Sequence, residues 1–146
     1  MGKDIRREAN YYIRKFNTNN PFDIAEYLNI KLFMVPLGNG VSGYYKYMKK
    51  NRCIFIDPDI ENETYKKIVM AHELGHAILH KTENCYFINH KTLLLSSKIE
   101  KEANIFAAEL LIKDSLINDY EGFTIKQIAD CTGITEELLK LKYNHK

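Results

Sequence analysis

The pentapeptide His-Glu-Leu-Gly-His at residues 72–76 combines residue types that bind a metal ion and activate water. On a helix, His72 and His76 lie one turn apart on one face, with Cβ atoms about 5–6 Å apart. Two imidazole nitrogens at that separation can both reach one Zn²⁺ at about 2.0–2.1 Å. Glu73 projects about 100° further round the axis, where it can take a proton from water beside the ion. The pattern predicts a zinc site at which one carboxylate takes a proton from metal-bound water.

The residues around this pentapeptide predict a buried helix from about 62 to 80. Its flanks are apolar, with Ile68–Ala71 on one side and Ala77–Leu79 on the other. The simpler alternative is an ordinary helix with a polar stripe. A glutamate buried between two histidines would then lack partners, which is costly, so the metal site is favoured.

His80 is the nearest further candidate ligand, but the helix places it too far away. It follows His72 by eight residues, about 12 Å along the axis. Patterns with a third histidine turn the chain at a glycine three residues after the second histidine, and Leu79 stands there. We therefore expect His80 at the helix end or beside a ligand, and not on the metal.

A catalytic zinc ion takes three protein ligands, so a carboxylate from a second helix is expected. The stretch SKIEKEANIFAAELL predicts a helix over about 97–113 that offers Glu100, Glu102 and Glu109. Glu100 and Asn104 share a face, so Asn104 is expected to orient a ligand or to hydrogen-bond His72 or His76. Ser97-x-x-Glu100 also has the form of a capping box, which competes for the same carboxylate. Glu100 is the preferred third ligand, and Glu102 is the alternative.

The rest of the chain predicts short elements around the metal helix. Periodicity and turn residues indicate a helix over 4–16, a helix from Asn20-Pro21 to about 28, a buried strand over 30–35, a hairpin with arms 44–48 and 53–57 joined through KKNR, a loop over 82–96, and short helices after Thr124 and Thr135. These elements predict an α+β fold, in which a small mixed or antiparallel sheet packs on a helical bundle.

Length, charge and cysteines narrow the class of protein. With 146 residues and a net charge of +2, we expect one domain over 1–146 without a basic face for nucleic acid. The start of the chain has no apolar signal segment, and no apolar run is long enough for a bilayer, which predicts a cytoplasmic protein. Cys53, Cys85 and Cys131 are far apart, so buried reduced thiols are expected in place of disulfides or a thiolate zinc site.

The segment over 123–143 has the spacing of a helix-turn-helix pair. Thr124-x-x-Gln127 predicts a capping box at the start of the first helix. The second helix begins at Thr135-Glu136-Glu137, which places two carboxylates where DNA phosphates would lie. We therefore expect a packing unit of the same domain. A DNA-binding regulator with a structural or inactive zinc site is the alternative function.

The paired motifs HELGH and EKEANIFAAELL, the latter over Glu100–Leu111, resemble the ImmA/IrrE family of zinc metallopeptidases. The segment PFDIAEYLNI, the Gly-rich turn after it and the strand ending in IDP fit the same family, so the resemblance covers about 20–140. One departure is Ile112-Lys113, where members often have Met-Pro; that position is structural.

The resemblance implies a gluzincin-like fold with one Zn²⁺ per chain. By position it makes His72, His76 and Glu100 the ligands and Glu73 the general base. It also implies a substrate, a helix-turn-helix repressor whose cleavage relieves repression of a mobile-element or stress regulon.

The sequence leaves alternatives for the position of the substrate and for the oxyanion donor. The substrate should lie extended along a sheet edge near the metal helix, and either hairpin arm could provide that edge. A donor for the oxyanion is also needed. The candidates are Tyr44, Tyr45, Tyr47, Tyr86, His80 and His90.

Overall fold

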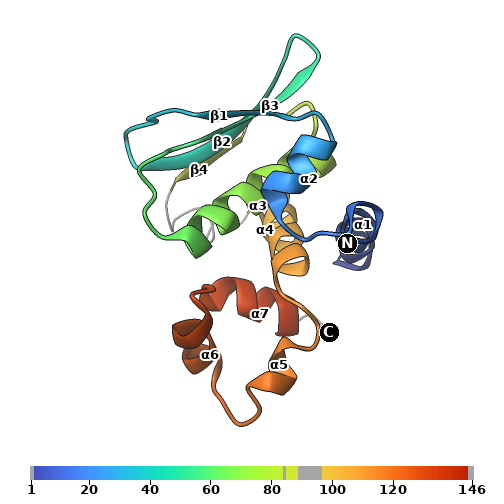
Figure 1. The fold of residues 1–146 in the computed structure, drawn as a ribbon, viewed down its shortest axis with the longest axis vertical. Helices are drawn as coiled ribbons and strands as arrows, with labels where there is room; N and C mark the ends of the chain where they lie inside the picture. Colours follow the sequence, from blue (N-terminus) through green and yellow to red (C-terminus); the bar gives the residue numbers. More distant parts are fainter. Residues whose placement is uncertain (1, 84, 89–96, 145–146) are drawn as a thin grey trace.

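The computed structural model describes residues 2–83, 85–88 and 97–144, which form a four-stranded sheet and the helices around it (Figure 1). The elements in chain order are α1 (Gly2–Phe16), α2 (Pro21–Tyr27), β1 (Lys31–Met34), β2 (Val41–Met48), β3 (Asn51–Ile56), α3 (Glu63–Leu79), β4 (Cys85–Ile88), α4 (Lys98–Leu111), α5 (Leu116–Asp119), α6 (Ile125–Thr132) and α7 (Glu136–Asn144). This arrangement confirms the predicted α+β fold.

The sheet has the strand order β1-β3-β2-β4, with β1 parallel to β3 and β2 antiparallel to both β3 and β4. The predicted hairpin is confirmed as β2–β3. Its turn is only Lys49-Lys50, with φ of 51° and 65°, as two-residue hairpin turns often require. Both hairpin arms are interior strands, so the prediction that one of them forms a sheet edge is wrong. Each arm also pairs with a strand outside the hairpin: β3 pairs with β1, and β2 pairs with β4. The spacing of residues within a strand does not predict which distant strand it pairs with.

Two further strand predictions are wrong. The predicted loop over 82–96 contains β4, whose four residues are too few to show a period; residues 84 and 89–96 lie outside the described residues. The predicted buried strand over 30–35 is the edge strand β1, with Leu32, Phe33 and Met34 each about two-fifths exposed, at 39%, 41% and 42%. An edge strand has a neighbour on one side only, so apolar composition does not guarantee burial.

Helix α3 runs through the middle of the molecule, with the sheet on one side and α4 on the other (Figure 1). It begins after Asn62, whose side chain accepts a hydrogen bond from the Tyr65 N–H, and it ends at His80. Every residue from Ile68 to Ala77 is buried. The sheet approaches closely at Gly43, where an added Cβ would lie 2.8 Å from Cγ1 of Val69. The predicted metal helix is therefore confirmed as the central element of the core.

The C-terminal helices α5–α7 lie beyond the end of α4 that points away from the sheet (Figure 1). The predicted capping box is present, with hydrogen bonds of 2.9 and 3.1 Å between Thr124 and Gln127. Leu138 and Leu139 of α7 are buried in the main core. Lys142 of α7 is also buried, with Nζ 2.6 Å from a carboxylate oxygen of Glu109 in α4. The helical pair thus packs on the helix that carries Glu100.

Replacing Lys142 with Ala is expected to destabilise the fold by about 3–5 kcal/mol, because Glu109 would remain buried without its cation. The ammonium also lies 2.6 Å from Asp114, so two carboxylates lose a partner. Chemical denaturation measures the change in the free energy of unfolding. The control is Lys140→Ala on the exposed side of α7, expected within about 0.5 kcal/mol of the parent. Equal effects of the two substitutions would contradict the prediction.

The described cysteines and helices bear on two earlier predictions. Cys53 and Cys131 are both free thiols; Cys53 is buried as predicted, whereas Cys131 is exposed, so that part of the prediction is wrong. Position 131 lies near the end of a short surface helix that buries only Ile128. Among the described residues, no helix combines the length and apolar character needed to cross a membrane.

Candidate metal centre

His72 and His76 of α3 and Glu100 of α4 converge on one point in the core. Nε2 of His72 lies 2.9 Å from Oε1 of Glu100, and Nε2 of His76 lies 3.1 Å from Oε2. The two Nε2 atoms are themselves 3.1 Å apart. In the described part of the chain, this is the one group of three or more His, Cys, Asp or Glu side chains whose ligand atoms lie within 4.8 Å of one another. Two imidazoles and a carboxylate are a donor set that suits zinc.

The charge states of His76 and Glu100 also suit a cation. Burial lowers the pKa of His76 to about 4, so its ring is neutral near pH 7. Burial alone would raise the pKa of Glu100, but hydrogen bonds from His72 and His76 outweigh it and hold the pKa at about 2. Glu100 is therefore ionised and His76 keeps a lone pair. Metal ligands must be in these forms.

Glu73 lies beside the trio, and its side chain is fully buried. Among the residues that the structure describes, neither of its carboxylate oxygens has a hydrogen-bond partner. Burial, and then the charge of Glu100, hold its pKa well above the usual value. An unpaired buried carboxylate is costly and needs an explanation. A water molecule activated by an ion at the trio would supply the missing partner, so the residues fit a catalytic metal.

The structure separates Glu100 from the other two carboxylates of α4. The Ser97 hydroxyl accepts the Glu100 N–H at 3.4 Å, so Ser97 caps the helix and leaves the Glu100 carboxylate to the histidines. Glu102 instead contacts His80, at 2.8 Å from Nε2. Asn104 lies where the sequence predicted, with its Oδ1 2.7 Å from Nδ1 of His72. With Nδ1 held by Asn104, the other ring nitrogen of His72, Nε2, faces Glu100.

The distance between the two site helices is set by Gly75, the fourth residue of the HELGH pentapeptide. A Cβ at this position would lie 3.2 Å from Cβ of Phe106 and 3.3 Å from the backbone of Ala103. The Ala103 contacts are backbone atoms, so α4 as a whole would have to shift. Because Glu100 belongs to α4 and the histidines to α3, that shift would open the trio.

Replacing Gly75 with Ala is therefore expected to weaken metal binding about tenfold or more and to destabilise the fold by about 1–3 kcal/mol through overpacking. The gain in helix propensity, about 1 kcal/mol, is smaller. Chelator competition measures the affinity and thermal unfolding measures the stability. Lys67→Ala, at an exposed position of the same helix, should change neither. Unchanged affinity in the Gly75 variant would show that the helix spacing does not control the site.

The described tyrosines among the candidate oxyanion donors each contact a different group. Tyr45 donates to the Lys81 carbonyl, and Tyr44 stacks on Phe55 with the ring centroids 4.5 Å apart. The ring of Tyr47 lies under the ammonium group of Lys81. The side chains of Tyr86 and His90 lie outside the described residues. We therefore assign no oxyanion donor from this set.

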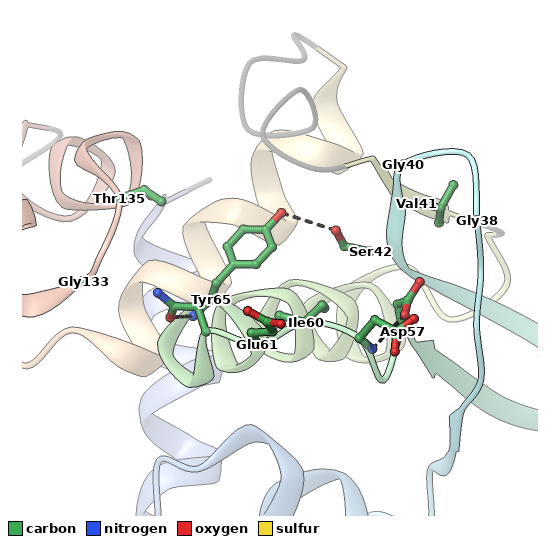
Figure 2. Close-up of a pocket in the computed structure, with 12 residues that line it drawn as sticks. Gly38, Gly40, Val41, Ser42, Asp57, Ile60, Glu61, Tyr65, Gly133 and Thr135 are labelled. Carbon is green, nitrogen blue, oxygen red and sulfur yellow. Dashed lines mark hydrogen bonds between the residues drawn. The ribbon is translucent and has the colours of Figure 1, made fainter.

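A pocket of about 540 Å³ lies beside the first turns of α3, but it does not contain the trio (Figure 2). The hydroxyls of Tyr65 and Ser42 face each other in it at 3.4 Å. Its acidic residues are Asp57, Asp59 and Glu61. Their oxygens are too far apart to form a metal cluster of the kind seen at the trio. The chemistry therefore belongs to the trio and not to this pocket.

Comparison with known proteins agrees with this geometry. Residues 25–143 match the family described as the IrrE N-terminal-like domain, and that span includes the whole trio and Glu73. The chain belongs to the ImmA/IrrE family of metallopeptidases. The predicted resemblance is thereby confirmed, and the matched range agrees with the predicted 20–140.

Two relatives extend the match to nearly the whole chain. Metallopeptidase ImmA of Bacillus subtilis (strain 168) is 31% identical over 131 residues, which cover 87% of this chain and 76% of that protein. The uncharacterized immunity region protein 2 of Bacillus phage phi105 is 39% identical over 140 residues, covering 94% of this chain and 88% of that protein. As a member of the ImmA/IrrE family, the chain is a metallopeptidase with a candidate metal site in its core.

Proposed function

We propose that the protein is a zinc-dependent endopeptidase in which His72, His76 and Glu100 hold one Zn²⁺ and Glu73 is the general base. The observation that carries the proposal is the convergence of three ligand groups within 4.8 Å, beside a buried carboxylate that has no hydrogen-bond partner in the described part of the chain. Sites of this His₂Glu type leave a fourth position for water or substrate.

The chain's own residues divide the work of peptide hydrolysis. When bound, the ion lowers the pKa of a water molecule and polarises the scissile carbonyl. Glu73 takes the proton from that water and passes it to the leaving amine. Its raised pKa suits this role, because a buried carboxylate binds a proton more tightly than one in water. Asn104 holds His72 so that its Nε2 faces the site.

The proposed substrate is a helix-turn-helix repressor whose cleavage relieves repression of a mobile-element or stress regulon. The family resemblance supports it, and so does the name of the 39% identical relative, which refers to an immunity region of a phage. A repressor substrate also favours a cytoplasmic location.

We propose that the scissile segment lies extended along β4, since β4 is a sheet edge and packs against α3.

We further propose that residues 1–146 form one peptidase domain that includes the helical pair over 123–143. The burial of Leu138 and Leu139 in the main core supports a packing role for the pair. Its second helix, α7, begins with Glu136 and Glu137, which would repel DNA phosphates. This pattern favours the peptidase reading over a DNA-binding regulator.

The direct test incubates the zinc-loaded protein with a candidate helix-turn-helix repressor and identifies fragments by mass spectrometry. We expect a single cut in the presence of zinc and none after chelation. Glu73→Gln serves as the matched control, because it removes the base and leaves the ligands. Cleavage of the repressor that persists in Glu73→Gln, or after chelation, would contradict the proposal.

A further inference from the structure

A line of side-chain contacts leads from His76 away from the trio, through the end of α3 and back to α4. Nδ1 of His76 lies 3.1 Å from Nδ1 of His80, and Nε2 of His80 lies 2.8 Å from Oε1 of Glu102. His80 is the C-cap residue of α3, and Glu102 follows Glu100 by two positions in α4. The side chains of His80 and Glu102 are only 8% and 18% exposed. These contacts are therefore shielded from bulk water.

Counting protons along this line fixes the role of each atom. A neutral imidazole has one N–H and one lone pair. If Nε2 of His76 gives its lone pair to the metal, its Nδ1 must carry the hydrogen, which it donates to Nδ1 of His80. His80 then carries its own hydrogen on Nε2 and donates it to Glu102, a carboxylate that only accepts. Every donor meets an acceptor in this one arrangement.

The two ligand histidines are held in parallel ways by different partners. His72 has Asn104 at its Nδ1, as the sequence predicted. At the Nδ1 of His76 the structure places His80, and Glu102 orients His80 in turn. Hydrogen bonds to a charged acceptor are about twice as strong as neutral ones, so Glu102 sets the direction of the whole line.

We propose that His80 and Glu102 are positioning residues for the metal site: they hold His76 in the tautomer and orientation that present Nε2 to the ion. This inference rests on the proposed metal site. It gives Glu102 a role distinct from that of a ligand, and it gives His80 a role that depends on lying at the helix end. Neither side chain touches the reacting atoms.

The test measures binding of Zn²⁺ by chelator competition and the visible absorption spectrum of the Co²⁺-loaded protein. His80→Leu should lower Zn²⁺ affinity about 10–100-fold, the range for partners of metal-binding histidines, and should alter the Co²⁺ spectrum. His80→Gln should recover much of the affinity, since one amide can accept from His76 and donate to Glu102. Glu102→Gln should give a smaller loss than His80→Leu. Glu83→Gln, the same substitution at an exposed position, should have no effect.

The outcomes separate this inference from the proposed function. If the parent protein binds Zn²⁺ and His76→Ala abolishes binding, but His80→Leu and Glu102→Gln bind as the parent does, only the inference fails. If His80→Gln binds as weakly as His80→Leu, the contact is one of packing and the inference also fails. If the parent takes up no Zn²⁺, both fail. Should His80→Leu not fold, Glu102→Gln and His80→Gln decide the matter, because they keep size and hydrogen bonding.

Discussion

Glu73→Gln is expected to abolish peptide cleavage while the protein keeps its metal. The amide cannot take a proton from water, and loss of a general base typically slows such reactions by about 10²–10⁴-fold. The proposed ligands His72, His76 and Glu100 are untouched, so zinc content and affinity should match the parent. Cleavage of the repressor, followed by electrophoresis and mass spectrometry, measures the first effect. Chelator competition measures the second.

The thermal stability of the Glu73→Gln variant shows whether a loss of cleavage comes from misfolding. The Glu73 carboxylate is fully buried, none of the described residues forms a hydrogen bond with it, and its pKa is raised by burial. A carboxyl whose pKa is raised on folding destabilises the native state as the pH rises above its unfolded value. Glu73→Gln removes that penalty, so the metal-stripped variant should unfold at a higher temperature than the parent near neutral pH. Normal cleavage by a well-folded variant would exclude Glu73 as the base.

Glu100→Gln is expected to lower Zn²⁺ affinity more than about 100-fold, because even partners outside the ligand set are worth about 10–100-fold. The loss has one main cause. The amide brings no negative charge to the cation, and a neutral amide oxygen is a weaker ligand for zinc than a carboxylate oxygen. Competition with a chelator of known affinity gives the dissociation constant, and cleavage should fall with it.

The matched comparison is Glu102→Gln, the same chemical change two residues along α4. Glu102 contacts His80 and is not part of the trio. Its substitution should therefore lower the affinity for Zn²⁺ clearly less than substitution of Glu100 does. If Glu102→Gln were the more damaging change, the third ligand would have been assigned to the wrong residue.

The sequence predicted the parts of this site that depend on neighbours along one helix. The spacing of His72 and His76 places both rings on one face whatever the rest of the fold does, and Glu73 follows from that register. The cap Ser97 could also be predicted from the sequence, because capping depends on residues within one turn. Glu100 required more: from residue spacing alone it competed with Glu102, and the family resemblance favoured it.

What the sequence did not predict depends on contacts between distant segments. Strand β4 has four residues and no visible period, and its pairing with β2 changes which strands form the sheet edges. The contact between His80 and Glu102 arises from how α3 and α4 cross, which Gly75 controls through close packing with Ala103. Side chains 22 positions apart leave no local signature of such a contact.

The most direct measurement is X-ray absorption at the zinc edge on the purified protein, combined with elemental analysis. The structure predicts one Zn²⁺ per chain, coordinated by two imidazole nitrogens at about 2.0–2.1 Å and by oxygen at about 2.0–2.2 Å, without sulfur. His76→Ala should lose that signal. A folded protein that takes up no zinc, or zinc bound through cysteine sulfur, would contradict the assignment of His72, His76 and Glu100 as the metal site.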